Sequence, residues 1–184
     1  QELSKRAAEL EYPIYVKPVK AGSSFGISRI TSPEQLPQAA EKAFEFDNEI
    51  TLEEEIPGRE VGCAVLGAEK LILGRVDLIQ SPGLFDYNEK YNPKESKIYM
   101  PAPIAPELEE RIQQTAAVLY RLLGCSGFAR VDMFLTPQNQ IVFNEINTIP
   151  GLTAHSRFPN MMKGAGLELK EVMRVLIELS LKNE

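Results

Sequence analysis

The stretch Arg130–Asn147 reads R-V-D-M-F-L-T-P-Q-N-Q-I-V-F-N-E-I-N, and its pattern decides the fold of the surrounding chain. Two short apolar segments flank the turn-like residues Thr136–Asn139, which is typical of a β-hairpin. If Gln138-Asn139 forms a two-residue loop, Asp132 lies directly opposite Glu145. The other opposed pair in this register is Phe134 with Phe143.

This hairpin brings two carboxylates together on one face. Directly opposed Cβ atoms lie about 5 Å apart, and side chains two positions apart on a strand point the same way. Asp132 and Glu145 therefore share a face with Asn147 and Arg130. Carboxylate and amide oxygens are hard ligands suited to Mg²⁺, which typically bridges to nucleotide phosphates. The alternative is a solvated sheet face with Arg130 as the counter-ion.

The composition is that of an ordinary globular protein. The chain has 184 residues, of which 43% are apolar and 25% charged, and its net charge is −6. Phosphate neutralisation needs clustered Lys and Arg, so we expect no nucleic acid partner. No apolar run approaches the roughly 18–20 residues of a membrane span and no secretory signal opens the chain, so we expect no membrane partner.

The two cysteines, Cys63 and Cys125, do not have the spacing of a disulfide framework. We expect both to be reduced and buried, which favours a cytoplasmic protein. Gln1 stands where an initiator Met would stand, and an amphipathic segment begins at once. We therefore expect this chain to be one piece of a longer protein.

The apolar patterns predict the order of strands and helices. Strands are expected at residues 12–18, 27–30, 50–52, 61–66 and 71–79. Helices are expected after Ser32, with Gln35 completing a capping box, from Pro106 to Gly124, and from about Glu168. The apolar faces of the first two helices are Leu36, Ala39, Ala40, Ala43 and Phe44, then Leu108, Ile112, Ala116, Leu119 and Leu123. Hairpin-linked strands with helices on one face predict an α+β fold and no doubly wound sheet.

Two loops have features that suit a nucleotide site. Residues 20–26, K-A-G-S-S-F-G, offer backbone N–H groups, hydroxyls and glycines that suit phosphates, although the segment could equally be a hairpin turn. Lys17 precedes it inside an apolar strand and would need an anionic partner if buried; otherwise it points into solvent. Residues 80–102 have little periodicity and predict a functional loop, in which Lys90 could reach a phosphoryl group and Tyr91 a substrate.

The acidic run of residues 53–55 and Glu60 has two interpretations. It is either a solvated turn or a source of carboxylates that accept hydrogen bonds from a nucleotide. His155 is the only histidine, and we assign it no role.

Five motifs in order resemble the D-alanine–D-alanine ligases of the ATP-grasp superfamily. They are V-K-P with G-S-S-F-G, the acidic segment ending in Glu60-Val61, F-D-Y-N-E-K-Y, G-F-A-R-V-D-M-F, and N-E-I-N-T-I-P-G-L-T-A-H-S. The resemblance implies an ATP-grasp fold in which ATP lies between two antiparallel sheets. It also implies a ligase that phosphorylates D-alanine and lets the amine of a second D-amino acid displace phosphate.

The resemblance implies a role for each matching residue. Lys17 would contact the ATP phosphates, Glu53 the adenine side and Glu60 the ribose. Two Mg²⁺ ions, with Mn²⁺ as an alternative, would be held by Asp132, Glu145 and Asn147. The loop residues over the acyl phosphate would be Ser23, Ser24, Lys90 and Tyr91. Arg130 and the Gly151 N–H would stabilise the oxyanion, and Ser156 would hold the second carboxylate.

The domain division follows from the same resemblance. Residues 1–60 would be part of the central ATP-grasp subdomain and residues 61–184 the C-terminal subdomain. Nothing in the chain matches the family's N-terminal substrate domain, so we expect this chain alone to be inactive or weak. A homodimer is one alternative for the full-length protein.

Arg157 separates two branches of this family. Several housekeeping members carry an apolar residue at this place in H-S-R-F-P, whereas vancomycin-resistance relatives look like this sequence. The E-K-Y loop is unlike that of the resistance ligases that make D-alanine–D-lactate, so D-serine and D-alanine remain as second substrates. Two alternatives to the ligase are an inactive nucleotide-binding fragment and another ATP-grasp carboxylate–amine ligase.

Overall fold

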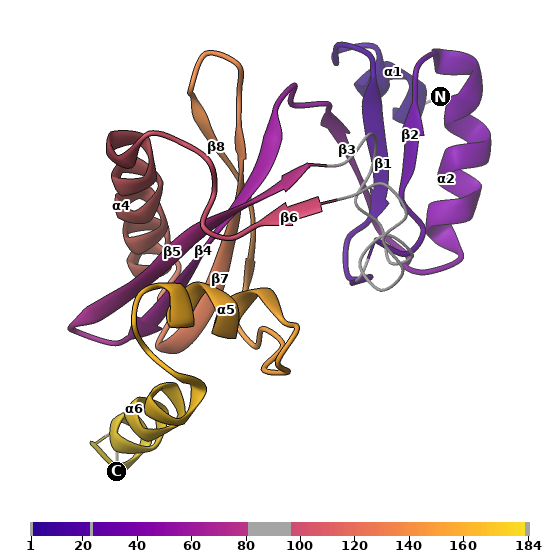
Figure 1. The fold of residues 1–184 in the computed structure, drawn as a ribbon. Helices are drawn as coiled ribbons and strands as arrows, with labels where there is room; N and C mark the ends of the chain where they lie inside the picture. The colour runs from indigo at the N-terminus through magenta and orange to yellow at the C-terminus, as the bar shows by residue number, and fades with distance from the viewer. Residues whose placement is uncertain (1, 23, 81–96, 183–184) are drawn as a thin grey trace. The chain divides into compact units, whose positions relative to one another are not determined.

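The computed structural model describes residues 2–22, 24–80 and 97–182. The described chain forms two compact units, one from residues up to Ile56 and the other from Pro57–Gln80 together with residues from Lys97 onward (Figure 1). Each unit has a sheet of its own and hydrophobic clusters drawn only from its own residues.

The first unit is a three-stranded antiparallel sheet with helices. Its elements are α1 Glu2–Ala7, β1 Ile14–Pro18, β2 Ser28–Ile30, the 3-10 turn η1 Pro33–Gln35, α2 Leu36–Phe44 and β3 Ile50–Glu54. The strand order is β2-β1-β3, so the central strand is β1. Ile14 and Val16 alternate with more exposed residues along β1 and are fully buried. This alternation is what places one face of β1 in the core.

The start of α2 follows the predicted capping pattern. The Ser32 N–H donates to Gln35 Oε1 at 3.3 Å, as a capping box requires. Leu36 and Ala43 are buried against the sheet, but Phe44 is 51% exposed. The expectation that Phe44 belongs to the apolar face was therefore wrong, because this last residue of α2 lies outside the core cluster of the first unit.

The second unit is built on a five-stranded sheet. Its elements are β4 Arg59–Gly67, β5 Leu71–Gln80, β6 Lys97–Tyr99, α4 Pro106–Leu122, β7 Gly127–Leu135, β8 Ile141–Asn147, α5 Arg157–Gly164 and α6 Leu169–Lys182. The strand order is β6-β5-β4-β7-β8, and all neighbours are antiparallel. Because two antiparallel sheets carry helices, the predicted α+β class is confirmed.

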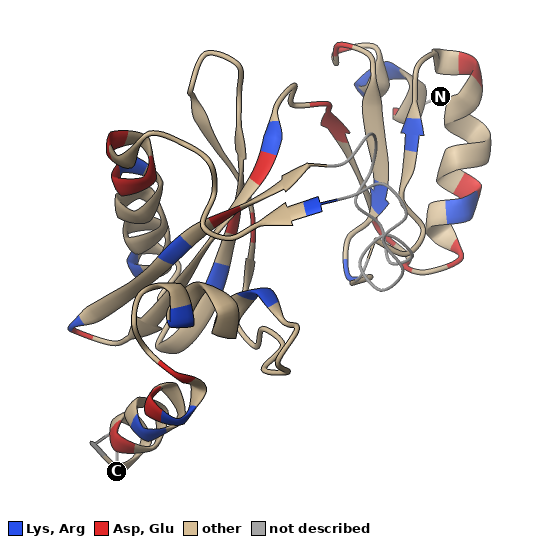
Figure 2. Cartoon of the chain, viewed as in Figure 1, with Lys and Arg blue, Asp and Glu red and all other residues tan. Residues whose placement is uncertain are grey.

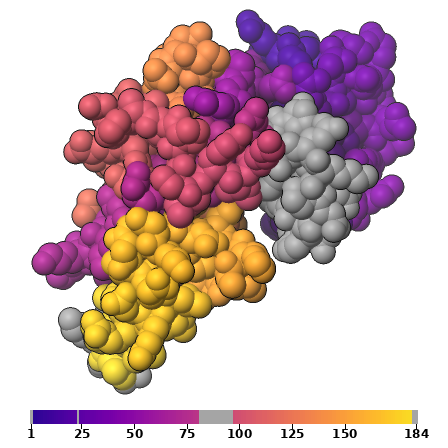
Figure 3. All heavy atoms as spheres, in the orientation of Figure 1, coloured from indigo at the N-terminus to yellow at the C-terminus, as the bar shows by residue number. Residues whose placement is uncertain are grey.

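Helices cover both faces of this second sheet. On one face α4 packs Ile112, Ala116 and Tyr120 against alternate residues of β4, β5 and β7. On the other face α5 and α6 cover Ala64 and Leu66 (Figure 1). Figure 3 shows the orange and yellow residues of α5 and α6 as one continuous mass. The expectation of helices on one face was therefore wrong for this unit, because β4 is apolar on both sides.

The hairpin of β7 and β8 has the predicted site pair but a different turn. Asp132 lies opposite Glu145 as expected, whereas Phe134 pairs with Val142 and Phe143 pairs with Met133. The expected pair of Phe134 with Phe143 was wrong, because the loop has three residues between Thr136 and Gln140 rather than two. Asn139 takes the left-handed backbone, with φ of 59°, that such a loop needs.

A bulge restores the expected pairing at the site. The register shifts between Asp132 and Met133, which leaves Asn144 as the extra residue on β8. The longer loop and the bulge displace the register in opposite directions. Asp132 and Glu145 therefore meet, although the loop that was expected to pair them is absent.

Three further features differ from the sequence expectation. The region expected as a loop at residues 80–102 contains strand β6 within its described part. Helix α5 was not predicted, and its buried Phe158 and Met161 pack on the sheet. Leu123, assigned to the apolar face of α4, is 52% exposed because the helix ends just before it.

Candidate functional site

One row of the second sheet runs across β5, β4, β7 and β8 and carries three acidic side chains around a glycine. Gly62 on β4 pairs with Asp77 on one side and Asp132 on the other, and Asp132 pairs with Glu145. Figure 2 shows acidic residues, in red, on these neighbouring strands. Asp77 and Asp132 are buried, so the charge of this row is largely withdrawn from water.

Asn147 joins the two predicted carboxylate ligands. Its Nδ2 donates to Asp132 Oδ2 at 3.0 Å and to Glu145 Oε1 at 3.1 Å. One oxygen of Asp132 and one of Glu145 therefore converge on the NH₂ group of Asn147, whose hydrogens carry partial positive charge. Turning the amide over would present its oxygen to the same position, which is the donor set that a hard cation prefers.

Arg130 holds Asp132 from the same strand. Its Nε lies 2.8 Å from Asp132 Oδ1 and its Nη2 lies 2.7 Å from Oδ2, a bidentate pair. Such fork geometry gives both groups a single orientation. Arg130 was expected on this face, and the structure places it there.

Arg157, the first residue of α5, reaches over the same row. Its Nε and Nη2 donate to Asp77 at 2.7 and 2.8 Å, and Nη1 donates to Glu60 at 3.2 Å. Its Nη2 also lies 3.3 Å from Asp132 Oδ1. Burial alone would lower the pKa of Arg157, but the charges of Asp132 and Asp77 outweigh it and raise that pKa well above its ordinary value.

The pairing of Asp77 with Arg157 was not predicted from the sequence. Asp77 and Arg157 are 80 positions apart, and neither belongs to a motif with a spacing rule. The only available signal was an acidic residue inside the apolar run L-I-L-G-R-V-D-L-I-Q. A buried charge on such a strand needs a partner, which is a hint that could have singled out Asp77.

Gly62 makes room for the network. A Cβ at this position would come into conflict with Arg157 Nη2 and would lie 2.9 Å from both Asp132 Oδ1 and Asp77 Oδ1. Glycine is therefore needed because three charged side chains converge over its backbone.

Charges in this group do not balance. Among the described residues it contains the carboxylates of Glu60, Asp77, Asp132 and Glu145 and the guanidinium groups of Arg130 and Arg157. Among these six described groups, carboxylates outnumber guanidinium groups by two. A divalent cation next to Glu145 and Asn147 would compensate this difference. The described residues contain no group of three or more His, Cys, Asp or Glu side chains placed to hold a metal, so the amide of Asn147 would be part of the ligand set.

Two of the predicted nucleotide residues of the first unit, Lys17 and Glu53, contact each other. Lys17 Nζ donates to Glu53 Oε2 at 2.5 Å, so its anionic partner within this unit is a carboxylate. The Lys17 side chain is 23% exposed, which excludes the purely solvent-facing alternative. Ser24 has a left-handed backbone with φ of 61°, and the Phe25 N–H donates to the Gly22 carbonyl at 3.3 Å. These residues form a tight turn.

Glu60, Gly151 and Ser156 belong to the second unit. Glu60 accepts a hydrogen bond from Arg157 Nη1 at 3.2 Å. The Ser156 hydroxyl lies 2.8 Å from Thr153 Oγ1 and accepts from the Thr153 N–H at 3.1 Å. A Cβ on Gly151 would lie 2.7 Å from Ser156 Oγ, so the two residues are neighbours at the start of α5.

Three of the predicted site residues, Ser23, Lys90 and Tyr91, lie outside the described residues. Cys63 and Cys125 are unpaired, as expected, but only Cys63 is fully buried.

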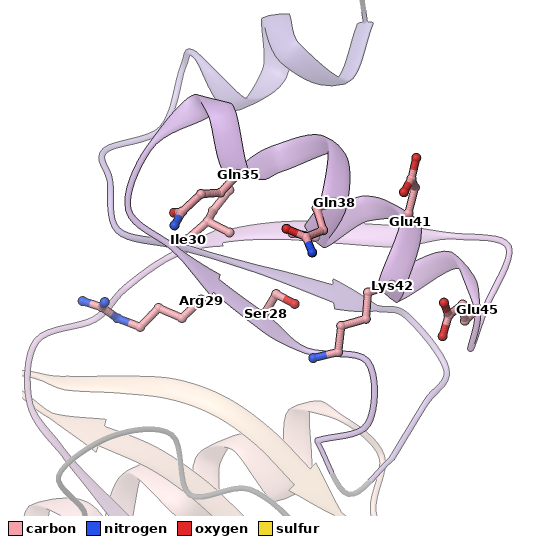
Figure 4. A pocket seen from close by; sticks show the side chains of 9 residues that line it. Ser28, Arg29, Ile30, Gln35, Gln38, Glu41, Lys42 and Glu45 are labelled. Carbon is pink, nitrogen blue, oxygen red and sulfur yellow. The ribbon is translucent and has the colours of Figure 1, made fainter.

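A separate hollow of ≈ 580 Å³ lies beside β2 and α2 in the first unit. Figure 4 shows side chains from both elements around it, among them Arg29 and Lys42. Both cations are already bonded within the protein, Arg29 to Glu55 at 2.7 and 2.8 Å and Lys42 to the Ile27 carbonyl at 3.2 Å. None of the predicted site residues lines this hollow.

Comparison with known families identifies the chain. The family model described as "D-ala D-ala ligase C-terminus" matches residues 1–178. The chain belongs to the D-alanine–D-alanine ligase family. The resemblance inferred from the five motifs is therefore confirmed.

Named relatives include both resistance and housekeeping members of this family. The chain is 44% identical to the vancomycin/teicoplanin A-type resistance protein VanA of Enterococcus faecium, over 96% of this chain and 53% of VanA. It is 42% identical to D-alanine–D-alanine ligase A of Escherichia coli K12, over 95% of this chain and 49% of that ligase. The chain thus spans about half the length of the relatives it matches.

A solved member of the family shares the fold. The crystal structure of the VanG D-Ala:D-Ser ligase from Enterococcus faecalis matches with a TM-score of 0.87 and 58% identity, over 95% of this chain and 51% of that one. The ligase from Coxiella burnetii matches with a TM-score of 0.84 at 30% identity. The two antiparallel sheets with their helices are therefore those of the ATP-grasp fold. In the described part of the chain, no helix has the length and apolarity of a membrane span.

Proposed function

We propose that the protein carrying this chain is an ATP-dependent ligase that joins D-alanine to a second D-amino acid through an acyl phosphate. Membership of the D-alanine–D-alanine ligase family supports this proposal. The observation that carries it is the convergence of Asp132 and Glu145 on Asn147, because this is a donor set for the cation that such a phosphoryl transfer needs. The product would be a dipeptide for cell-wall precursor synthesis, made in the cytoplasm.

Asp132, Glu145 and Asn147 would hold Mg²⁺, with Mn²⁺ as an alternative. The bound ions would neutralise the phosphate charge during transfer. Arg130 lies beside this set with its guanidinium oriented by Asp132. We assign it, together with the Gly151 N–H, to the developing oxyanion, because a donor already held in place costs no reorganisation during the reaction.

The first unit would contribute nucleotide contacts. The Lys17 ammonium would pair with ATP phosphate and Glu53 would accept from the adenine, while Ser24 would offer its backbone N–H and hydroxyl to the phosphates. Lys17 and Glu53 at present bond to each other, so the two proposed nucleotide contacts lie side by side. In the second unit, Ser156 would hold the second substrate's carboxylate and Glu60 the ribose.

D-serine is our proposed second substrate, and D-alanine is the alternative. The 58% identity to a solved ligase titled D-Ala:D-Ser favours D-serine over D-alanine. The two substrates differ by one hydroxyl, which a site can read strongly only with a hydrogen-bonding partner. Arg157 directly follows Ser156 and binds Asp77, and this polarity agrees with a substrate that carries a hydroxyl.

The test is phosphate release by the full-length protein with ATP, Mg²⁺ and D-alanine, with and without D-serine, and with products identified by mass. A dominant mixed dipeptide supports D-serine, and D-alanine dipeptide alone supports the housekeeping alternative. Absence of both products would contradict the ligase.

Variants locate the reaction at the proposed site. Asp132→Asn and Glu145→Gln should each lower kcat/KM by about 100-fold or more, because each removes a charged ligand of the cation. Glu178→Gln is the matched control, since Glu178 is exposed on α6 and pairs only with Arg174 among the described contacts. Unchanged turnover in both site variants would place the cation elsewhere.

A further inference from the structure

Strand β5 contains a bulge that determines which face Asp77 occupies. Cys63 pairs with Val76 and Val65 pairs with Leu73, so Gly74 and Arg75 together lie opposite the single residue Ala64. Leu71 and Leu73 face the α4 side of the sheet before the bulge, and Val76 and Leu78 face the same side after it. Without the extra residue, the alternation of the strand would turn Asp77 into the apolar core under α4.

Helix α4 binds each residue of this bulge. Gln113 Nε2 donates to the Gly74 carbonyl at 2.8 Å. Glu109 accepts from Arg75 Nε at 2.7 Å, from Arg75 Nη2 at 3.0 Å and from the Val76 N–H at 3.0 Å. Glu109 is only 9% exposed, and a carboxylate is costly to bury unless it is hydrogen-bonded in this way.

Asp77 connects the bulge on β5 to the candidate metal site on the opposite face of the sheet. It is fully buried and binds Arg157 through both carboxylate oxygens. Arg157 in turn lies 3.3 Å from the proposed ligand Asp132. If Asp77 were displaced, the guanidinium of Arg157 would lose its two shortest bonds and would be drawn further onto Asp132, where it would compete with a cation.

We propose that Glu109 and Gln113 are positioning residues for the metal site, because they hold the β5 bulge that keeps Asp77 clamped on Arg157. The expected effect on Mg²⁺-dependent turnover rests on the proposed function, because the cation is part of that function. The bulge and its hydrogen bonds to α4 are observed independently of the proposed function.

The kinetic test compares Glu109→Ala with Glu110→Ala in the full-length enzyme. We expect Glu109→Ala to raise the Mg²⁺ concentration needed for half-maximal turnover by about 10-fold, with a smaller change in kcat, because small displacements of site residues weaken binding strongly. Glu110 is one position along α4, exposed, and bonded only to Gln114 among the described contacts, so its variant should keep the wild-type requirement. Glu109→Gln should rescue part of the effect, since it keeps an acceptor for the Val76 N–H.

A thiol measurement reports on the bulge without any turnover. Cys63 Sγ lies 3.7 Å from the Gly74 carbonyl and is buried, whereas Cys125 is partly exposed. Alkylation of each thiol, followed by mass spectrometry of peptides, should show faster labelling of Cys63 in Glu109→Ala, with Cys125 unchanged as the internal reference. Equal Cys63 labelling in wild type and variant would overturn the role of Glu109 in holding the bulge.

A double variant separates this proposal from its premise. If Glu109 acts through Asp77, adding Glu109→Ala to Asp77→Asn should raise the Mg²⁺ requirement no further. Additive effects would overturn the route through Asp77. If the wild-type enzyme lacked ligase activity while Cys63 labelling still responded to Glu109→Ala, the proposed function would fail and the bulge contact would stand.

Discussion

At the scale of single residues, Arg157 makes the buried acids of the second sheet tolerable. Asp77 and Asp132 are almost completely inaccessible, and a buried carboxylate without a counter-ion would be very costly. The Arg157 guanidinium bonds to Asp77 through two nitrogens and also reaches Asp132 and Glu60. One cation with several directed donors therefore serves three acids, which a lysine could not do with the same geometry.

Gly62→Ala should destabilise the protein by about 1–3 kcal/mol, as overpacking of a close-packed interior usually does. The new methyl would lie 2.9 Å from one oxygen of Asp77 and one of Asp132, and it would displace Arg157. The measurement is the urea unfolding midpoint.

Gly22→Ala is the control for replacing a glycine by alanine, since a Cβ there meets nothing within 4 Å. If both variants unfolded at the same urea concentration, the space over Gly62 would not be needed for Arg157.

At the scale of elements, bulges decide which side chains reach the site. The bulge at Asn144 on β8 brings Asp132 opposite Glu145 despite a three-residue loop. The bulge at Gly74-Arg75 on β5 turns Asp77 to the same face. Because side chains alternate along a strand, one extra residue is enough to move every later side chain to the other face.

The bulge on β5 should be sensitive to acid through Glu109. Burial alone would raise the pKa of Glu109, but hydrogen bonds from Arg75 and the Val76 N–H lower it below its ordinary 4.5. A carboxyl with a lowered pKa in the folded state stabilises that state above its unfolded pKa, and this contribution is lost as the pH falls through the folded value. Wild type should therefore lose more stability than Glu109→Gln between neutral pH and about pH 3.

The measurement is the difference in urea midpoint between wild type and Glu109→Gln at the two pH values. That difference should shrink on acidification. The same difference for Glu110→Gln should stay nearly constant, because Glu110 is exposed and bonds only to a neutral amide among the described contacts. If the difference in urea midpoint between wild type and Glu109→Gln did not change with pH, the ionised Glu109 carboxylate would not be what stabilises the bulge.

At the scale of the whole molecule, the described chain has two units with separate cores. The cluster around Ile14 and Val16 contains only residues of the first unit. The clusters around α4 and around α5 and α6 contain only residues of the second. The proposed phosphate and adenine contacts Lys17, Ser24 and Glu53 therefore belong to the first unit, whereas the proposed ribose contact Glu60 and the proposed metal ligands belong to the second.

Ile14→Ala should affect the first unit selectively. Truncating a fully buried isoleucine costs about 2–5 kcal/mol through lost burial and the cavity left behind. Hydrogen exchange should accelerate in β1, β2 and β3, while β4 and β7 keep their protection. Met133→Ala, at a fully buried position of the second unit, should give the reverse pattern. Equal acceleration in both units after either substitution would show a single cooperative core.

The metal-ligand candidates were predicted from local spacing, and their pairing holds because the bulge at Asn144 offsets the longer loop. Asp132, Glu145 and Asn147 lie within one hairpin, where strand alternation and a short turn limit which residues can meet. Lys17 and Glu53 were singled out separately, and their mutual bond depends on the pairing of β1 with β3. Helix α5 was not predicted, because its eight residues are too few for the spacing of apolar residues to indicate a helix.

Residue patterns alone were enough to predict the class of fold, the family resemblance, and the hairpin that presents two carboxylates and an amide on one face. The packing of the sheet and its helices was needed to show that Asp77 and Arg157 join this row, that Gly62 lies beneath them, and that Glu109 holds the strand in register from the other side. The reason is the range of the interactions. Alternation along a strand is encoded by residues two positions apart, whereas the place of a bulge and the partner of a buried charge depend on elements that meet only when the sheet and its helices pack together.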